Sequence, residues 1–370
     1  MTADAKYGLW GAMNFCTACG RTTASAGDVR PQGHGPRTRA ARWWLATLLV
    51  CVLSMHASTA VAADPLPSWR DRASRQAIVA FVEKVTARGS GEYVEEAERI
   101  AVFDNDGTLW SEAPMPVQMD FVLHELKRRA PQEPELASDP MVQAALAGDF
   151  DALMAGQSHA GLLRVLQLTH TGMTTDDFRR RVRAWAAQYR HPRFGAGLAA
   201  VTYTPMRELL DYLRNNGFTT YIVSGGGADF MRAFAQELYG VPPEQVIGST
   251  TDTEFVLADG VAALRKTSER MFIDDKLAKP VGIHERIGRR PVMAVGNSDG
   301  DQAMLEYTTL GNPHPSLGVL VHHTDARREY AYDASPPVSG RLANALAVAP
   351  SRGWIVVDMA ADWSNVLHPH

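Results

Sequence analysis

Two aspartates separated by one residue stand directly after a short apolar segment of the chain. Asp104 and Asp106 follow the apolar run at residues 100–103, and Gly107 loosens the turn that carries them. Two carboxylates at positions i and i+2 of such a turn can be aimed at one point, where one attacks phosphorus and the other transfers the leaving group's proton. Their charges repel each other and any phosphate, so this chemistry requires a cation, and Mg²⁺ suits oxygen ligands. Taken alone, the pair would also fit a solvated acidic turn.

Two further polar segments have the composition of a site for phosphate and a cation. Ser224 opens a Ser-Gly-Gly-Gly stretch after the apolar run 219–223, and residues 296–301 read Gly-Asn-Ser-Asp-Gly-Asp after the apolar run 292–295. A hydroxyl, closely approaching backbone N–H groups and a following helix N-terminus favour a phosphate group. Amide and carboxylate oxygens suit a hard cation. The alternative for the Gly-rich stretch is a plain flexible turn.

A phosphate site of this kind also needs a positive side chain, and two lysines are candidates. Lys279 precedes Pro280, a residue favoured at the first position of a helix, which places its amine at the mouth of a helix expected over 280–287. Lys276 stands beside two aspartates that can simply pair with it. We favour Lys279 and keep Lys276 as the alternative.

The elements that must position these residues alternate between strand and helix. The expected strands are 99–103, 219–223, 292–295, 317–322 and 354–357, the expected helices are 71–86, 206–216, 228–239 and 280–287, and Asp259-Gly260 is expected to turn a hairpin over 255–264. Strands separated by helices form a parallel sheet covered on both faces, and ligands gather beyond the carboxyl ends of its strands. The polar segments at 104–108, 224–227 and 296–301 are therefore expected to converge on one site.

Together these segments resemble the four motifs of the haloacid dehalogenase superfamily, in the same order along the chain. Residues 102–109 (Val-Phe-Asp-Asn-Asp-Gly-Thr-Leu) resemble the first motif, and residues 221–227 resemble the second. Lys279 corresponds to the lysine of the third motif, and residues 296–301 resemble the fourth. Each motif stands at the end of an expected strand, which strengthens the resemblance.

The resemblance implies a role for each motif residue. Asp104 would become a phosphoaspartate, and Asp106 would act as general acid and then general base, with Ser224 and Lys279 completing the catalytic set. Phosphate binding would fall to Asn105, Gly107, Thr108, Ser224, Gly225 and Lys279, and the Mg²⁺ ligands would be Asp104, Asp106, Asn297 and Asp301. The sequence departs from the common pattern at Asn297, where a carboxylate is usual. Either its amide oxygen binds the metal or Asp299 or Asp301 contributes more, and Asp301 is a ligand or an anchor for the ligands.

The fold implied by the resemblance is an α/β, doubly wound parallel sheet of Rossmann-like type with an inserted α-helical cap, as in the phosphoserine-phosphatase-like branch. Residues 64–111 and 201–370 would form the hydrolase core, and the largely helical residues 112–200 would form the cap. The expected activity is Mg²⁺-dependent hydrolysis of a phosphomonoester. A phosphomutase and a non-catalytic protein that binds phosphorylated ligands are the alternatives.

Residues 1–63 are expected to be a leader rather than part of the folded protein. Three arginines within residues 37–42 precede an uncharged apolar run at 43–55, and a stretch of small residues ends at Ala63. This arrangement is typical of a signal peptide, so we expect export to the periplasm or secretion, with no stable membrane span after cleavage. The alternative is an uncleaved membrane anchor, which needs about 20 apolar residues.

Cysteine usage and charge narrow the class of partner. All three cysteines lie in the leader, so the remainder of the chain has none. The leader has six basic and two acidic residues, a net charge of +4, and the whole chain has −4, so residues 64–370 carry −8. An acidic protein without a basic stripe binds nucleic acid poorly, and a small phosphorylated substrate is the better expectation. The oligomeric state is left open.

Overall fold

The computed structural model describes residues 64–156 and 159–368, and the predicted signal peptide lies outside them. Within the described residues, strands form a seven-stranded sheet in the order β4-β3-β2-β1-β5-β6-β7. Neighbouring strands are parallel except for β3 and β4, which are antiparallel. The strands are β1 (Ile100–Phe103), β2 (Thr219–Gly227), β3 (Val246–Ala258), β4 (Val261–Phe272), β5 (Met293–Gly296), β6 (Leu317–His322) and β7 (Ile355–Asp358).

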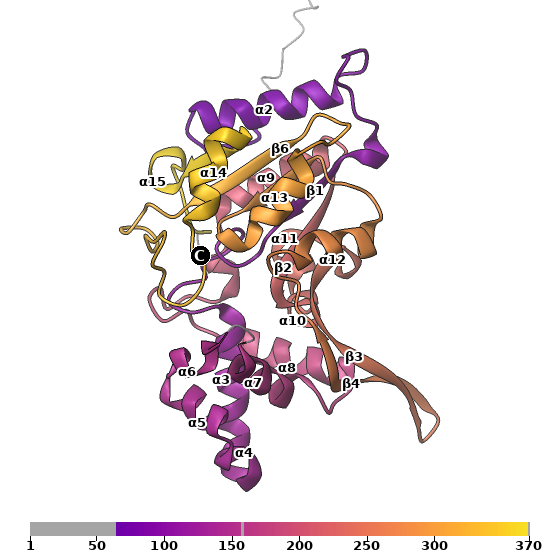
Figure 1. Ribbon diagram of the computed structural model, residues 1–370, viewed down its shortest axis with the longest axis vertical. Coiled ribbons are helices and arrows are strands. Elements are labelled where there is room, and N and C mark those ends of the chain that lie inside the picture. The colour runs from indigo at the N-terminus through magenta and orange to yellow at the C-terminus, as the bar shows by residue number, and fades with distance from the viewer. Residues whose placement is uncertain (1–63, 157–158, 369–370) are drawn as a thin grey trace, which may run out of the picture. The chain divides into compact units, whose positions relative to one another are not determined.

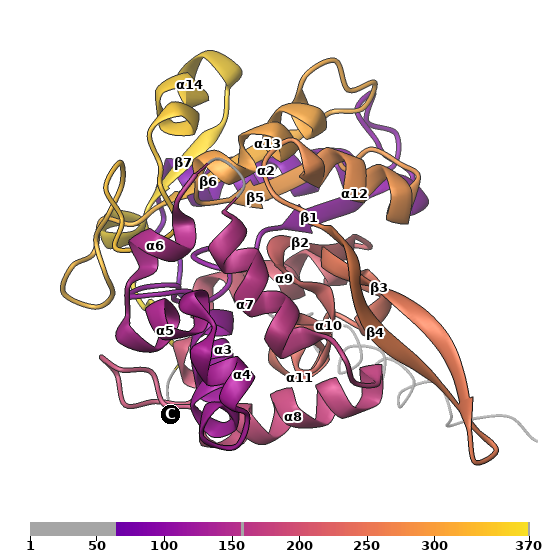
Figure 2. The ribbon, with the colours of Figure 1, turned by 60° about the horizontal axis from the view of Figure 1, so that its bottom comes forward.

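Helices cover both faces of this sheet (Figures 1 and 2). They are α2 (Ala73–Thr86), α9 (Thr204–Asn215), α10 (Ala228–Arg232), α11 (Ala235–Tyr239), α12 (Ala278–Ile287), α13 (Gln302–Thr309), α14 (Asn344–Arg352) and α15 (Met359–Asp362). Side chains alternate along β1: Ala101 and Phe103 join an apolar cluster with α2 and α9, while Ile100 and Val102 join a second cluster with α12, α13 and α14. A strand buried on both faces is typical of the doubly wound α/β core that the sequence predicts.

The segment between β1 and β2 folds into helices that pack on one another. They are α3 (Val117–Arg129), α4 (Pro134–Ser138), α5 (Pro140–Ala147), α6 (Phe150–Met154), α7 (Ala160–His170) and α8 (Thr175–Gln188). Val122, Leu126, Val142, Leu153 and Val165 belong to an apolar cluster that α3 to α7 share, separate from the two clusters of the sheet. The buried side chains of α8 join the first sheet cluster instead. We call residues 117–188 the cap (Figure 1). The domain limits expected at 111/112 and 200/201 stay predictions.

Two elements next to the second strand differ from the sequence-based expectation. β2 continues through Ser224 to Gly227, with an irregular register against β3 between these two residues, instead of ending before a turn. The helix expected over 228–239 is interrupted at Phe234, which separates α10 from α11. The Phe234 ring packs on Trp110 with 5.2 Å between ring centroids, so tertiary packing overrides the helical spacing there.

The hairpin turned by Asp259-Gly260 is confirmed, but it is longer than expected. β3 and β4 pair from Thr250↔Phe272 to Ala258↔Val261. Asp259 (φ +51°) and Gly260 (φ +76°) adopt the left-handed conformations that a two-residue hairpin turn favours. β4 therefore forms an antiparallel edge strand on an otherwise parallel sheet.

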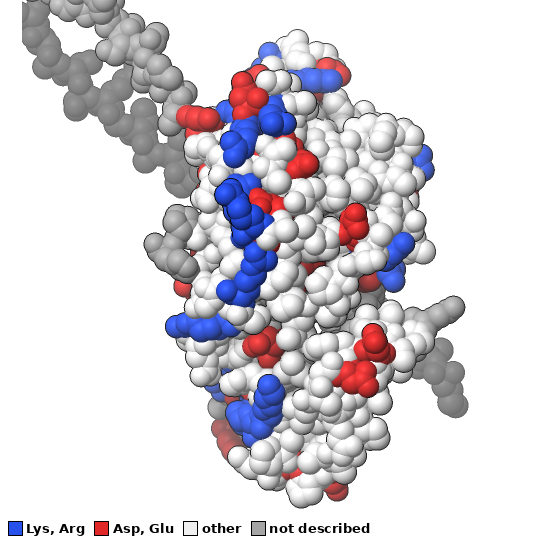
Figure 3. All heavy atoms as spheres, turned by 90° about the vertical axis from the view of Figure 1, so that its left-hand side faces the viewer, with Lys and Arg blue, Asp and Glu red and all other residues white. Residues whose placement is uncertain are grey.

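The surface bears on the partners that the sequence predicts. Among the residues that the structure describes, no helix combines the length and apolar character needed to cross a membrane. On the face shown in Figure 3, Lys and Arg side chains gather in a band with acidic side chains scattered beside it. The predicted absence of a nucleic-acid partner therefore rests on net charge alone and stays a prediction.

Candidate active site

The carboxyl ends of β1, β2 and β5 meet around one buried amine. Lys279, on the first turn of α12, donates hydrogen bonds from Nζ to Oδ1 of Asp104 (2.6 Å), to Oδ1 of Asp301 (2.6 Å) and to the main-chain carbonyl of Val223 (3.0 Å). Asp104 follows β1, Asp301 follows β5, and Val223 lies in β2. The predicted convergence of three distant polar segments is therefore confirmed.

The two candidate lysines have different surroundings. Lys279 is 2% exposed, whereas Lys276 is an exposed side chain. Burial by itself lowers the pKa of the Lys279 amine, but the carboxylates of Asp104 and Asp301 raise it above its usual value, so the amine stays charged. All three of its N–H donors are engaged by the protein. Lys279 is therefore placed to influence a bound anion through its charge and its hold on Asp104, not through a hydrogen bond of its own.

The two motif aspartates have different partners. Burial raises the pKa of Asp104 well above its usual range, and the charge of Lys279 opposes this rise. Burial raises the pKa of Asp106 to about 6, although a hydrogen bond from Nε1 of Trp110 to Oδ1 (2.6 Å) opposes the rise. A carboxyl with a raised pKa carries a proton more readily, which is what a general acid requires.

The turn that carries these aspartates admits only glycine at position 107. Gly107 has φ +75°, a conformation that residues with a Cβ rarely adopt. A Cβ there would also collide with the side chains of Asn297 and Glu112. The amide of Asn297 accepts a hydrogen bond at Oδ1 from the hydroxyl of Thr108 (3.0 Å) and donates from Nδ2 to Oε1 of Glu112 (2.8 Å). Asn297 thus fastens the first motif to the fourth.

A buried network of polar side chains supports the same turn from the opposite side. His323 donates from Nε2 to the main-chain carbonyl of Gly107 (2.7 Å), and its Nδ1 lies 3.2 Å from Oε2 of Glu329. The ring of Tyr332 stacks on His323, and its hydroxyl donates to Oε1 of Glu112 (2.7 Å). His323, Glu329 and Tyr332 lie more than 200 positions from Gly107 in sequence and match no motif, so the sequence carries no signal that would pair them with it.

Asp301 is engaged on both of its carboxylate oxygens. Oδ1 accepts from Lys279, and Oδ2 accepts from the main-chain N–H groups of Asn297 and Ser298, both at 2.9 Å. With both oxygens occupied by protein donors, the geometry favours the anchoring role for Asp301 over the ligand role.

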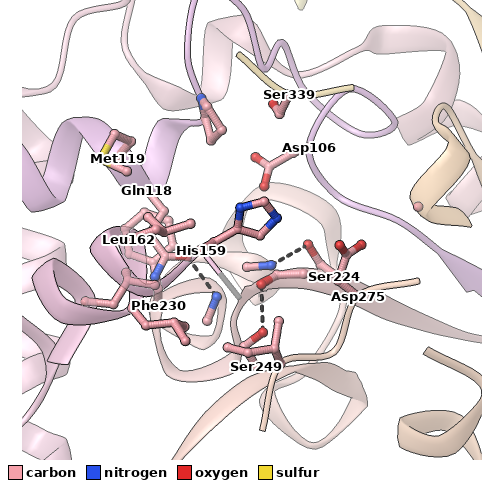
Figure 4. A pocket seen from close by; sticks show the side chains of 18 of the residues that line it. Asp106, Gln118, Met119, His159, Leu162, Ser224, Phe230, Ser249, Asp275 and Ser339 are labelled. Carbon is pink, nitrogen blue, oxygen red and sulfur yellow. Dashed lines mark hydrogen bonds between the residues drawn. The ribbon is translucent and has the colours of Figure 1, made fainter. Parts of the chain in front are cut away.

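A cavity of about 790 Å³ opens beside these residues, between the core and the cap. Asp104, Asp106, Ser224 and Gly225 line it, and Ser224 Oγ accepts a hydrogen bond from the N–H of Gly226 (3.1 Å). Figure 4 shows Asp106, Ser224 and Asp275 together on one side of this cavity.

The structure places four of the predicted phosphate contacts outside the cavity lining. Lys279 is one of them, and the others are Asn105, Gly107 and Thr108. The Thr108 hydroxyl is turned to Asn297, and the Gly107 carbonyl accepts from His323. Asn105 is 1% exposed. Asn105, Gly107 and Thr108 hold the turn in place because the sharp bend after β1 directs them into the protein.

The surroundings of Asp104 fit a hard cation. Asp104, Asp106, Glu112 and Asp301 bring four carboxyl groups to the site, and Lys279 is the one basic side chain that bonds to any of them among the described residues. Among the hydrogen bonds of those residues, none ends on Oδ2 of Asp104. No described group of three or more His, Cys, Asp or Glu side chains has the arrangement of a metal site. A cation would therefore depend on Asp104, the Asp106 carbonyl and the amide oxygen of Asn297, which are ligands that Mg²⁺ accepts.

An aspartate pair, a buried lysine and a serine–glycine segment at the carboxyl edge of a doubly wound sheet are the arrangement that a haloacid dehalogenase type of protein requires. The family model "haloacid dehalogenase-like hydrolase" matches residues 101–306, more than half of the chain. The chain belongs to this family.

Comparisons with individual proteins do not assign the chain to a particular branch of the family. No curated protein matches the sequence. A conserved protein of unknown function from Anaerococcus prevotii has a similar structure, with 18% identity and a TM-score of 0.44 over 68% of this chain and 85% of its own. A protein of unknown function from Bordetella pertussis shares 17% identity, with a TM-score of 0.42 over 71% and 99%. A phosphoserine phosphohydrolase-like protein from Francisella tularensis shares 15% identity, with a TM-score of 0.36 over 68% and 98%. The phosphoserine-phosphatase-like branch stays a prediction.

Proposed function

We propose that the protein hydrolyses phosphomonoesters and that Asp104 is its nucleophile. The observation that carries this proposal is the amine of Lys279, which joins Asp104 to Asp301 at 2.6 Å on each side. This contact holds one carboxylate oxygen of Asp104 and leaves Oδ2 for attack at the wall of the cavity. Asp104, Asp106 and Ser224 line the same cavity.

The reaction has two steps that share the same two carboxyl groups. In the first, Oδ2 of Asp104 attacks phosphorus, the bond from phosphorus to the ester oxygen breaks, and protonated Asp106 gives its proton to that oxygen. In the second, Asp106 takes a proton from water, the water oxygen attacks phosphorus, and the bond to Asp104 breaks to release phosphate. A pKa of about 6 allows Asp106 to serve as acid and then as base near neutral pH. Ser224 donates to a phosphate oxygen in both steps.

The site also calls for a cation, and we propose Mg²⁺. Asp104, the Asp106 carbonyl and Asn297 would hold it, and when bound it supplies positive charge that offsets the repulsion between the phosphate and the surrounding carboxylates. Chelation with EDTA should therefore remove activity, and added Mg²⁺ should restore it. Equal rates with and without EDTA would contradict this part of the proposal.

The first experiment is release of nitrophenol from p-nitrophenyl phosphate by the purified protein with Mg²⁺. The Asp104→Asn variant should lose at least about 10³-fold in kcat because it removes the nucleophile. Asp259→Asn is the matched control, because Asp259 is exposed at the tip of the β3–β4 hairpin and Asn is tolerated in its left-handed conformation. Retained activity in Asp104→Asn would refute the nucleophile. Binding of phosphate without any turnover would favour the non-catalytic alternative, and transfer to a sugar phosphate would favour the phosphomutase.

A further inference from the structure

The cavity beside Asp104 continues well past the space that a phosphate group needs. The wall opposite the catalytic carboxylates comes from α3, α7 and α8 of the cap and from α10 of the core. Its side chains are mainly apolar: Met119, Val122, Leu162, Leu166, Phe178 and Phe230. Figure 4 shows Met119, Leu162 and Phe230 together on the side away from Asp106 and Ser224. A leaving group bound there leaves water and packs against hydrocarbon side chains.

We propose that the alcohol released by this protein is apolar, an alkyl or aryl group large enough to fill the space under the cap. This inference rests on the proposed phosphatase activity and names its substrate class. Apolar surface transferred from water to such a wall contributes favourably in proportion to its area. A polar alcohol gains nothing there, because its hydroxyl or charged groups would lose water without finding partners.

The charged side chains of this wall are already neutralised by each other. Lys266 on β4 is 4% exposed and forms an ion pair with Asp229 on α10. Its ammonium group also lies 5.1 Å from the centre of the Phe178 ring. A leaving group that carries a carboxylate and an ammonium group, as phosphoserine does, would have to break this pair to find counter-charges on this wall. Other charged residues that line the cavity, Asp275, Lys276, Asp299 and Arg341, lie outside the helices that form it. Breaking a buried ion pair is costly, so the wall selects against such substrates.

The polar side chains on the same wall also have internal partners. Gln118 accepts at Oε1 from the N–H of Gly227 (2.7 Å), and its Nε2 donates to Nε2 of His170 (2.8 Å). Nδ1 of His170 in turn lies 2.8 Å from the hydroxyl of Thr169. These bonds satisfy Gln118 and His170 without a ligand. His159, just before α7, also lines the cavity, and its Nδ1 lies 2.9 Å from the carbonyl of Met154 (Figure 4). Apart from this imidazole, the wall offers a ligand hydrocarbon and aromatic surface.

The direct test compares esters of equal charge and different leaving groups. The purified protein with Mg²⁺ is assayed for phosphate release from ethyl, butyl, hexyl and 2-naphthyl phosphate and from phosphoserine and glycerol 3-phosphate. We expect kcat/KM to rise about fourfold per added methylene, and hexyl phosphate to exceed ethyl phosphate by on the order of 10²-fold. Higher kcat/KM for phosphoserine or glycerol 3-phosphate than for hexyl phosphate would overturn the substrate class and leave the phosphatase proposal intact.

Binding to the Asp104→Asn variant separates the two proposals. Titration calorimetry with hexyl phosphate, ethyl phosphate and phosphoserine measures the preference of the wall without turnover. Tighter binding of hexyl phosphate supports the inference even if no ester is hydrolysed by the native protein. Equal affinity for the three ligands overturns it, whatever the native protein hydrolyses.

Two substitutions on α7 localise the effect. Leu162 and Leu166 line the cavity, are half-buried and pack against the cap's buried cluster without belonging to it. The substitutions to compare are Leu162→Gln and Leu166→Gln. Each should lower kcat/KM for hexyl phosphate at least about tenfold and change that for ethyl phosphate by less than about twofold. Leu168→Gln on the same helix is the matched control, because Leu168 is half-buried but does not line the cavity. Equal losses for both esters in both variants would contradict a leaving-group site.

Discussion

At the scale of single residues, the site depends on the hydrogen-bond partners that the fold gives to two buried carboxyl groups, those of Asp104 and Asp106. Asp104 is held by the amine of Lys279, whose charge opposes the rise in the pKa of Asp104 that burial causes. Asp106 is held by the indole N–H of Trp110, a neutral donor, and the nearby charge of Glu112 adds to the effect of burial in raising its pKa. In the proposed mechanism, the same residue type therefore serves as nucleophile beside a charged donor and as acid beside a neutral one.

Asp106→Asn tests this division of roles. Loss of a general acid costs about 10²–10⁴-fold where the leaving alcohol is a poor one, and much less where it is nitrophenolate. With hexyl phosphate we therefore expect the rate of the first step to fall strongly. With p-nitrophenyl phosphate we expect a burst of nitrophenolate followed by slow turnover, because the base for the second step is missing. Stopped-flow measurement of the burst checks this.

The same group predicts a pH dependence for the first step of the native protein. Asp106 must carry a proton to act as acid, and its pKa is about 6, so single-turnover rates with hexyl phosphate should fall as the pH rises above about 6. Rates with p-nitrophenyl phosphate should fall less.

Equal losses of rate for hexyl phosphate and p-nitrophenyl phosphate in Asp106→Asn, without a burst, would show that Asp106 is not the general acid.

The amide at position 297 has a physical reason that the sequence did not reveal. Nδ2 of Asn297 donates to Oε1 of Glu112, so a carboxylate at 297 would bring two like charges together. The sequence motif identified Asn297 as unusual, but Glu112 lies 185 positions away and its partnership depends on tertiary packing. The fourth motif has an amide at position 297, and the carboxylate beside it is that of Glu112, five residues after Gly107 of the first motif.

A swap of charges between these two positions is testable. Asn297→Asp should destabilise the metal-free protein by about 1–3 kcal/mol, because a donor to a buried carboxylate is replaced by a repelling oxygen. Adding Glu112→Gln should recover most of this loss, since the second amide can donate to the new carboxylate. Urea unfolding in the presence of EDTA measures all four proteins of the cycle. Additive losses in the double variant would contradict a direct pairing.

At the scale of elements, sequence pattern located strands well where a short apolar run ended in a polar turn. β1, β5 and β6 were found in this way, and their shared edge followed from the alternation with helices. The β3–β4 hairpin was recognised only around its turn. Its outer ends carry polar residues such as Thr253 and Lys266, whose strand conformation comes from pairing across the hairpin and not from an apolar pattern.

A chain of hydrogen bonds joins the cap to the core at the end of β2. It runs from the N–H of Gly227 through Gln118 and His170 to Thr169, whose hydroxyl donates to the carbonyl of Val165 (2.7 Å). Since Gln118 donates to Nε2 of His170, the imidazole must be neutral to accept. Burial and the charge of Lys266 lower the pKa of His170 to about 3.

Acid should therefore weaken this protein in a way that depends on His170. The unfolded chain protonates His170 near pH 6.5, while the folded protein keeps it neutral to about pH 3, so the unfolded state binds more protons between these values. Stability should fall by about 1.4 kcal/mol per pH unit on acidification below pH 6.5 through this group. His170→Gln should be less stable at pH 7.5 and should show a flatter pH dependence in urea unfolding.

A matched control separates this effect from the general response to acid. His284 is exposed on α12, and His284→Gln should keep the native slope between pH 6.5 and 4.5. Identical slopes for His170→Gln and the native protein would contradict a neutral, buried His170.

At the scale of the whole molecule, the family and the doubly wound core were accessible from the sequence because three of the four motifs share one geometric rule, a polar segment at the end of a strand. The cap was recognised as helical, but its contribution to the cavity was not. Which of its apolar residues face the phosphate site depends on how α3, α7 and α8 pack against α10, and helical spacing alone does not distinguish a core-facing stripe from a cavity wall.

We propose that residues 1–63 direct export, in keeping with the arginines, the apolar run and the small residues that end at Ala63. When the full chain is produced in a Gram-negative host, the periplasmic fraction should contain a protein that begins at about residue 64, as measured by intact mass and N-terminal sequencing. Because signal peptidase requires a small residue before the cut, replacing Ala62 and Ala63 with Phe should leave the uncleaved chain in the membrane fraction. A native chain that keeps its leader and stays with the membrane would instead establish the anchor. Residues 64–370 contain no cysteine, so an oxidising compartment cannot form a disulfide in them. The thermal stability of the cleaved protein should therefore be the same with and without a reductant.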